Sequence, residues 1–378
     1  MISRYVMKYC IKTITFLFAI TCHADDLVIT SFSQNGVVTW TYPTNEVSEY
    51  RIEWASSLVL EEWTDLRCGI QGLAPTGGTM TANVPMFYRV LSFSVMPTNM
   101  VYIPAGRFDM GDSFSEGNPR EQPVHSVYLS GYWIDQYEVS SQLWYDVYSW
   151  SLTNGYIFSN TGSGKTNNHP VNSVNWYDAV KWCNARSERE GLTPCYYIDS
   201  SLSNAYRKWE TDIQNDWVDW TANGYRLPTE AEWEKAARGG SARQRFPWGS
   251  SSISHGRANY FASTNYSYDQ SSGGYHPNFS TGSPPYTSPI GNFSPNSYGL
   301  YDCAGNVWEW CWDWYSDSYY ANSPNINPRG PGGPLLERVK RGGSWDFVAN
   351  LSRVAFRDYN YPDSDSYGDV GFRCARGL

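Results

Sequence analysis

After its first 24 residues, the 378-residue sequence contains no apolar run that approaches 18 residues, the length that a bilayer-spanning helix needs. It is also poor in basic residues, since 28 Lys and Arg stand against 37 Asp and Glu for a net charge of −9. Phosphate backbones are bound by clustered positive charge, so this balance argues against a nucleic-acid partner. Acidic loops instead suit bound cations or solubility.

Ligands for a histidine-based metal site or triad are scarce as well. The five histidines stand singly, with no metal-ligand spacing, at His23, His125, His169, His255 and His276. No CxxC pair exists, which argues against structural zinc. No Gly-x-Ser-x-Gly elbow accompanies a histidine triad. We interpret His169, which precedes Pro170, as a loop packing residue rather than a catalytic base.

The N-terminus has the pattern of a secretory signal. Arg4, Lys8 and Lys12 precede a short apolar run over residues 14–20, and the small residue Ala24 suits a cleavage site. The pattern predicts a signal peptide over residues 1–24 and an exported protein with no membrane span after cleavage. An uncleaved anchor and a lipid on Cys22 are the alternatives. Export would permit disulfides among the six remaining cysteines, which are Cys68, Cys183, Cys195, Cys303, Cys311 and Cys374.

The pattern of short β-rich runs in residues 25–96 predicts a small all-β domain. Short β-rich runs occur at residues 27–29, 37–40, 50–54 and 87–91, separated by turn residues. Strands at this spacing loosely resemble a fibronectin type III sandwich, a class that acts as a spacer or adhesion unit. Residues 96–99 read as a linker, so a second domain is expected over residues 97–378.

The second domain should have few helices and long aromatic loops. Asn175 and Thr229 are typical helix caps, and the helices that they start should end before Gly191 and at Gly239. A third helix is expected over residues 141–150, with Leu143, Val147 and Trp150 on one face. Residues 250–288 predict a long surface loop whose aromatic side chains pack.

A series of landmarks follows in the second domain. They are residues 104–111, 135–139, 169–171, 224–234, 247–249, 299–302, 305–310, 341–345, 353–357 and 371–374. In this order they resemble the formylglycine-generating enzymes, or sulfatase-modifying factors, over about three quarters of the chain. The resemblance implies an irregular α+β fold related to C-type lectins.

The resemblance also implies calcium. The family binds Ca²⁺ at the position of Asn306, the Val307 carbonyl and Glu309, which are hard oxygen ligands at a turn. A second ion is implied near Asn259 and the Tyr260 carbonyl. The alternative is that Asn306 caps the turn while Glu309 pairs with an arginine.

Arginines and cysteines complete the implied scaffold. We expect Arg353, Arg357 and Arg373 to form buried bidentate pairs with carboxylates such as Glu230 or Glu234, with ligand binding as the alternative. Two cysteines match a family disulfide, namely Cys183 and Cys374. Cys303 and Cys311 either form a disulfide with each other, or one of them is a buried thiol. Cys195 has no assigned partner.

The family's oxidase activity depends on a cysteine pair that this sequence lacks. The family oxidises a substrate cysteine with oxygen and Cu(I), which two thiolates hold just after a Gly-Gly-Ser step. Phe347 occupies the first cysteine's place here, and residues 346–352 contain no cysteine. Cu(I) is therefore not expected, and the domain is interpreted as a calcium-stabilised module. The groove that binds substrate in the family's enzymes corresponds here to Ser344, Trp345, Asp346 and Phe347, and it would hold a peptide, protein or glycan. The alternative is a formylglycine-generating oxidase that uses non-standard residues.

Overall fold

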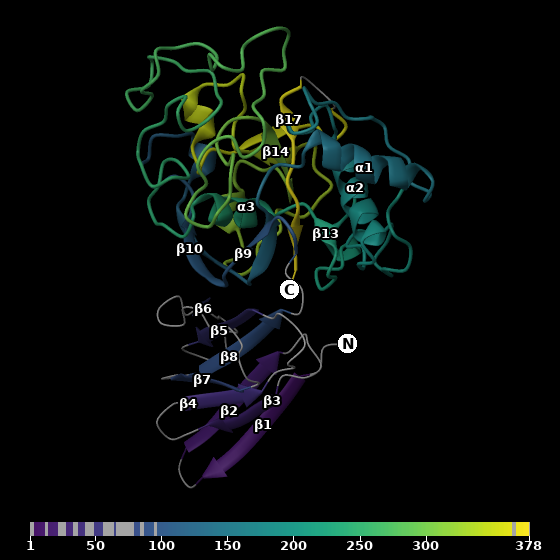
Figure 1. Cartoon of the computed structure of the whole chain (residues 1–378), viewed down its shortest axis with the longest axis vertical. Helices are drawn as coiled ribbons and strands as arrows, with labels where there is room; N and C mark the ends of the chain where they lie inside the picture. Colours follow the sequence, from purple (N-terminus) through teal and green to yellow (C-terminus); the bar gives the residue numbers. More distant parts are fainter. Residues whose placement is uncertain are drawn as a thin grey trace. The chain divides into compact units, whose positions relative to one another are not determined.

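The computed structural model describes residues 97–364 and 368–377 with their side chains, and before residue 97 it describes only the backbone of strands. The chain divides into two compact units: residues 1–98 with 104–106, and residues 99–103 with 107–378. Figure 1 traces the chain through both units.

The first unit consists of antiparallel strands in a hairpin, β1-β2, and two three-stranded sheets, β3-β4-β7 and β6-β5-β8. The strands are β1 (Arg4–Ile11), β2 (Ile14–Thr21), β3 (Val28–Phe32), β4 (Val37–Thr41), β5 (Glu49–Ala55), β6 (Thr64–Asp65), β7 (Thr79–Asn83) and β8 (Phe87–Phe93). The four expected β-rich runs overlap β3, β4, β5 and β8. The signal peptide and the fibronectin type III likeness stay predictions.

The second unit is built on two four-stranded sheets, ordered β13-β18-β12-β9 and β16-β15-β14-β17, and a two-stranded ribbon, β10-β11. The strands are β9 (Met100–Ile103), β10 (Gly106–Met110), β11 (His125–Leu129), β12 (Tyr132–Asp135), β13 (Tyr225–Arg226), β14 (Trp308–Trp314), β15 (Arg338–Arg341), β16 (Asp358–Asn360), β17 (Val370–Gly371) and β18 (Ala375–Arg376). The last residues of the chain thus enter both sheets, because β17 pairs parallel to β14 and β18 lies between β13 and β12.

Helices of this unit begin where the sequence caps them. The helices are α1 (Ser141–Leu152), α2 (Trp176–Arg189), α3 (Glu230–Ala237), α4 (Tyr319–Asn322), η1 (Pro119–Glu121), η2 (Asn215–Trp217) and η3 (Ala349–Ser352). The Asn175 side chain accepts from the Asp178 N–H at 2.8 Å, and Thr229 forms a capping box with Glu232, so both expected caps are confirmed. The expected face of α1 is wrong in part. Trp144 and Val147 are buried, whereas the expected Leu143 and Trp150 are only half-buried, because it is Trp144 that stacks on Trp182 of α2.

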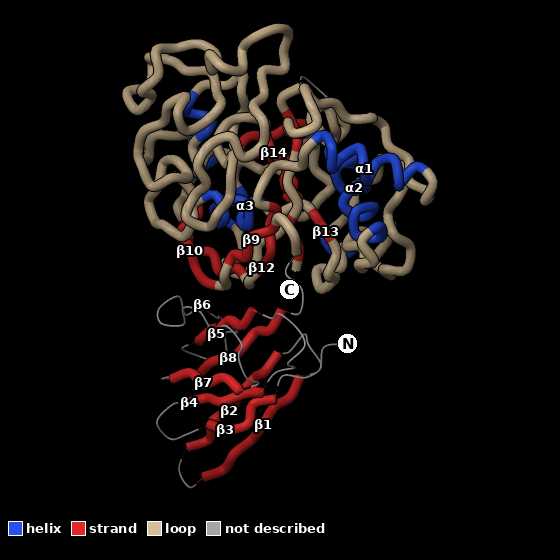
Figure 2. The backbone as a smooth tube through the Cα atoms, viewed as in Figure 1, coloured by secondary structure: helices blue, strands red, loops and turns tan. Residues whose placement is uncertain are grey.

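Loops make up much of the second unit, as Figure 2 shows in tan. Residues 238–307, which are all described, contain no helix or strand. They are nevertheless packed, because Ile253, Ala258 and Tyr260 lie in a buried cluster with Phe246. The expectation of a long loop with packed aromatic side chains is therefore confirmed.

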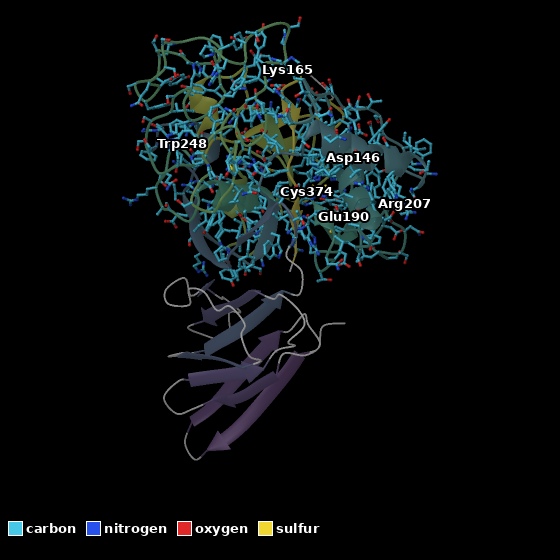
Figure 3. The ribbon with its side chains drawn as sticks, viewed as in Figure 1. Asp146, Lys165, Glu190, Arg207, Trp248 and Cys374 are labelled. Carbon is cyan, nitrogen blue, oxygen red and sulfur yellow. The ribbon has the colours of Figure 1, made fainter. Side chains whose placement is uncertain are left out.

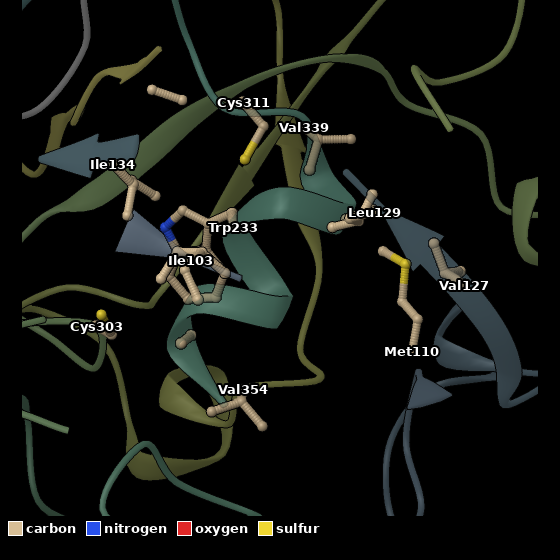
Figure 4. Packing of buried hydrophobic residues seen from close by; sticks show 14 of the residues in the cluster. Ile103, Met110, Val127, Leu129, Ile134, Trp233, Cys303, Cys311, Val339 and Val354 are labelled. Carbon is tan, nitrogen blue, oxygen red and sulfur yellow. The ribbon is translucent and has the colours of Figure 1, made fainter. Parts of the chain in front are cut away.

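The main core surrounds α3. Trp233 lies on this helix among Ile103, Ile134 and Val354, as Figure 4 shows from close by. Among the described residues, no helix is long and apolar enough to cross a bilayer.

Buried ion pairs join segments that are far apart in the sequence. Each of the three arginines forms a two-pronged pair with a glutamate: Arg353 with Glu121, Arg357 with Glu230, and Arg373 with Glu309. The expectation of buried bidentate pairs is confirmed, although only Arg357 uses one of the two carboxylates that were expected. Planar guanidinium groups suit this role because they match a carboxylate with two parallel hydrogen bonds.

Candidate functional site

Residues 342–347 form a turn that leaves β15. Gly342 and Gly343 have φ of 99° and 75°, which L side chains rarely adopt. A Cβ on Gly343 would also lie 2.6 Å from the Ser352 Oγ. The glycines therefore allow the chain to leave the strand sharply, so that Ser344 and Trp345 are buried while Asp346 is exposed.

An aromatic cluster surrounds this turn. The rings of Tyr275 and Tyr286 lie 5.8 Å and 5.3 Å from that of Trp345, and 5.0 Å from each other. Phe261 contacts Tyr275 edge to face at 4.9 Å. Its N–H donates to the Phe347 carbonyl at 3.0 Å, which ties the long loop to the turn. The Tyr275 side chain is 37% exposed, so the cluster reaches the surface through this ring.

We call Tyr275, Tyr286, Trp345, Asp346 and Asp369 the aromatic–acidic surface. The Tyr275 hydroxyl donates to Asp346 Oδ1 at 2.7 Å, and this bond raises the pKa of Tyr275 to about 12. Asp369 is buried, and its Oδ2 accepts from the Ser344 hydroxyl at 3.4 Å. Burial raises the pKa of Asp369 to about 6, although the charge of Lys340 and the bond from Ser344 oppose the rise. One carboxylate, Asp346, thus belongs to the turn itself, and the other, Asp369, bonds to the serine of the turn.

Phe347 packs beside the turn rather than on this surface. Its ring lies 5.7 Å from that of Trp308, and the Lys340 ammonium lies 5.8 Å from it and 4.6 Å from the Trp308 ring. Of the four expected groove residues, Trp345 and Asp346 thus belong to the aromatic–acidic surface. Ser344 is buried and bonds to Asp369 of that surface, and Phe347 contributes to the packing beside it.

The residues predicted to bind the first calcium ion are engaged with protein groups. Glu309 accepts two bonds from Arg373, at 2.6 and 2.7 Å, and one from the Trp233 indole at 2.7 Å. This geometry follows from the sheet, because Glu309 is paired with Gly371 on β17, two residues before Arg373. The Asn306 Oδ1 accepts from the Ser288 N–H at 2.8 Å. The arginine pairing of Glu309 is therefore the arrangement that the structure contains.

Two further carboxylates lie near Glu309, and sequence reasoning did not assign them to the metal site. Glu138 accepts from the Asn306 side-chain amide at 2.6 Å and from the Val307 N–H at 3.2 Å. Asp302 Oδ2 accepts from the Gly291 N–H at 2.6 Å, whereas its Oδ1 is buried with no hydrogen-bond partner. Burial, followed by the neighbouring carboxylates, raises the pKa of Glu138 well above its ordinary value, and burial raises that of Asp302 to about 6. The Tyr-Glu-Val landmark was the sequence signal for Glu138.

The residues predicted for the second calcium ion are also hydrogen-bonded within the protein. The Asn259 carbonyl accepts from the Asn306 N–H at 2.8 Å, and its side-chain amide donates to the Tyr286 carbonyl at 2.8 Å. The Tyr260 carbonyl lies 3.1 Å from His255 Nε2. Among the described residues, no three or more His, Cys, Asp or Glu side chains are grouped so that they could hold a metal ion. Backbone carbonyls would have to supply part of any coordination.

The predicted disulfide partners lie side by side as free thiols. The Sγ atoms of Cys183, on α2, and Cys374, next to β18, are 3.7 Å apart and fully buried. Figure 3 labels Cys374. Cys195, Cys303 and Cys311 are also free and buried. His169 is buried and bonds to the Thr287 hydroxyl at 2.8 Å, in keeping with its interpretation as a packing residue.

The fold and this site define a loop-rich domain of mixed helices and strands. In this domain a glycine-led turn after a central strand presents a surface of aromatic and acidic side chains. The chain belongs to the sulfatase-modifying factor enzyme 1-like family, whose domain model matches residues 91–378.

Relatives of known description include enzymes and an inactive protein. The chain is 35% identical over 305 residues to the formylglycine-generating enzyme of Streptomyces coelicolor, covering 73% of this chain and 88% of that protein. It is 31% identical over 308 residues to the bovine inactive C-alpha-formylglycine-generating enzyme 2, covering 74% and 88%. Among solved structures, Treponema denticola variable protein 1 matches with a TM-score of 0.54 and 30% identity, covering 74% of this chain and 95% of that one.

Proposed function

We propose that this protein is an exported, calcium-stabilised binding module that uses the aromatic–acidic surface and has no copper oxidase activity. The observation that carries the proposal is Phe347, which stands where the family's first catalytic cysteine is expected, in a segment without cysteine. A soft Cu(I) ion needs soft thiolate ligands, and neither a phenyl ring nor a carboxylate replaces them. The bovine relative described as inactive supports the idea that this scaffold serves without the oxidase reaction.

The remaining cysteines do not offer an obvious substitute. The five described cysteines are buried, and burial raises the pKa of Cys195 and Cys303 to about 12, which disfavours the thiolate that copper would need. The opposing hypothesis, an oxidase with non-standard residues, draws its support from the enzyme relatives.

The oxidase hypothesis is tested by incubating the purified full chain with Cu(I), oxygen and a cysteine peptide of the sulfatase type. The peptide mass is then measured, with the Streptomyces coelicolor enzyme as positive control. We expect no conversion by this chain. A peptide mass that matches formylglycine, formed only when the chain is present, would refute the proposed function.

Calcium is proposed at the turn formed by residues 302–309. Glu138, Asp302 and Glu309 are three buried carboxylates, and Arg373 is the cation that pairs with one of them. Glu138 and Asp302 are thus the two carboxylates whose charge a divalent cation could balance. Asp302 Oδ1 is the unpartnered oxygen, so the Asp302 carboxylate and nearby backbone carbonyls would hold the ion. The ion would supply positive charge that stabilises the turn.

This calcium proposal is tested by thermal unfolding with CaCl₂ and with EDTA. We expect calcium to raise the melting temperature of the wild type, and Asp302→Asn to abolish that response. Asp146→Asn, which removes an exposed carboxylate on α1 (Figure 3), should keep it. Equal melting temperatures with calcium and with EDTA would sink the idea.

A further inference from the structure

The two carboxylates of the aromatic–acidic surface differ from other acidic groups in this unit. Glu121, Glu230 and Glu309 are each matched by an arginine. Among the described residues, no lysine or arginine forms an ion pair with Asp346 or Asp369, whose side-chain hydrogen bonds come from neutral hydroxyl groups. Neither carboxylate therefore has a cation within ion-pair distance in the described part of the chain, although the nearby charge of Lys340 lowers the pKa of Asp369.

Two lysines near this surface, Lys340 and Lys165, have contacts of their own. The Lys340 ammonium lies 3.3 Å from an Asp358 oxygen and over the Trp308 ring at 4.6 Å. Lys165 donates to the Phe279 carbonyl at 3.0 Å and lies 5.8 Å from the centre of the Tyr286 ring. A cation from outside the chain would thus meet the exposed Asp346 carboxylate, which has no cation beside it in the described segments. Behind it is the buried Asp369 carboxylate, which the charge of Lys340 offsets only in part.

Aromatic rings beside these carboxylates favour the same kind of ligand. A cation near the face of Tyr or Trp is attracted by the electrons of the ring, and more strongly where water is excluded. Tyr275 is 37% exposed and is held in place by its bond to Asp346, whereas Trp345 is only 5% exposed. A sugar ring needs a broad exposed aromatic face on which to stack. Of the three rings on this surface, Tyr275, Tyr286 and Trp345, Tyr275 is the most exposed, so the surface favours a cation over a sugar.

We propose that the aromatic–acidic surface binds a cationic side chain of a peptide or protein partner between Asp346 and Asp369. The cation is a lysine ammonium or an arginine guanidinium. This inference rests on the proposed function. Charge-assisted hydrogen bonds to the carboxylates supply the specificity. The net charge of −9 attracts such a partner at low salt.

The test uses four acetylated and amidated pentapeptides, Gly-Ser-Xaa-Ser-Gly, in which Xaa is lysine, arginine, norleucine or glutamate. Binding to the full chain is measured by saturation-transfer NMR and titration at 50 mM and 500 mM NaCl. We expect the lysine and arginine peptides to bind at least about tenfold more tightly than the norleucine peptide, and high salt to weaken them. Equal affinity for the lysine and norleucine peptides, or no binding by any of the four, overturns the inference.

Variants locate the binding. Asp346→Asn and Asp369→Asn should each weaken the lysine peptide about tenfold, whereas Asp146→Asn should bind as the wild type does. Undiminished binding by both surface variants would overturn the assignment to this surface. Binding of a neutral glycan that Asp346→Asn abolishes, with no preference for cationic peptides, would overturn this inference and leave the binding-module proposal standing. Oxidation of a cysteine peptide would refute the proposed function whatever the preference for cations.

Discussion

Oxidation of Cys183 and Cys374 should stabilise the second unit strongly. Their Sγ atoms are 3.7 Å apart, and the two residues are separated by 191 positions in the sequence. A bond between them would close a very long loop and so restrict the unfolded chain. The chain-entropy relation gives about 5 kcal/mol for a loop of this length. For a unit of this size that corresponds to a rise of roughly 10 °C in melting temperature.

The assay compares the same protein in two redox states. The full chain is purified without reductant, the disulfide is mapped by peptide mass spectrometry, and thermal unfolding is followed with and without dithiothreitol. The Cys183→Ala variant is the control, since its melting temperature should not respond to the reductant. The reasoning is refuted if Cys183 and Cys374 are linked but the wild type melts within about 1 °C in both states.

Three further predictions concern single side chains. Arg353→Met leaves the buried Glu121 carboxylate without its arginine and should cost about 3–5 kcal/mol in urea unfolding; a cost below about 1 kcal/mol would contradict the pairing. Asn175→Ala removes the cap of α2 and should cost about 1–2 kcal/mol, with helix loss visible by circular dichroism before global unfolding. Asp369 has a folded-state pKa of about 6, above the ordinary aspartate value of 3.8, so the folded protein holds this proton more tightly than the unfolded chain does. Its charge therefore costs stability above about pH 6, and that cost disappears as the pH falls towards 4. Asp369→Asn should be more stable than the wild type by about 1–3 kcal/mol at pH 7.5 and nearly equal to it at pH 4; a variant that is less stable at pH 7.5 would contradict the shift.

Local signals in the sequence predicted the parts of the fold that depend on neighbouring residues. Asn175 and Thr229 cap helices because their side chains reach an N–H three residues ahead, which needs no tertiary contact. The family could be recognised from the order of the landmarks, because these short motifs mark turns and strand ends that follow one another in a fixed order along the chain. The face of α1 was harder to predict, since Trp144 and Trp150 both suit a helix and only packing against Trp182 distinguishes them.

Partners across long sequence distances could not be predicted. Arg353 reaches Glu121 rather than Glu230 because η1 lies beside it in the fold. The two residues are 232 positions apart, and the sequence between them offers many acidic alternatives. Tyr275 likewise belongs to a loop without helix or strand, whose path to Asp346 is set by buried side chains rather than by any periodicity. The candidate surface was therefore recognisable in the sequence only from residues 344–347.

The distribution of charge in the second unit separates scaffold from function. Leaving a charge buried without a partner is unfavourable, so a chain selected only for stability would pair or replace it. The pairs of Glu121 and Glu230 follow that rule, which makes them parts of the scaffold. Asp302 and Asp369 depart from it, since each has a raised pKa and neither forms an ion pair among the described residues. Such a charge is relieved either by a proton or by a ligand that brings positive charge. Asp302 therefore suits a metal ion within the fold, and Asp369, beside the Gly-Gly-Ser turn, suits a cation that arrives from solution.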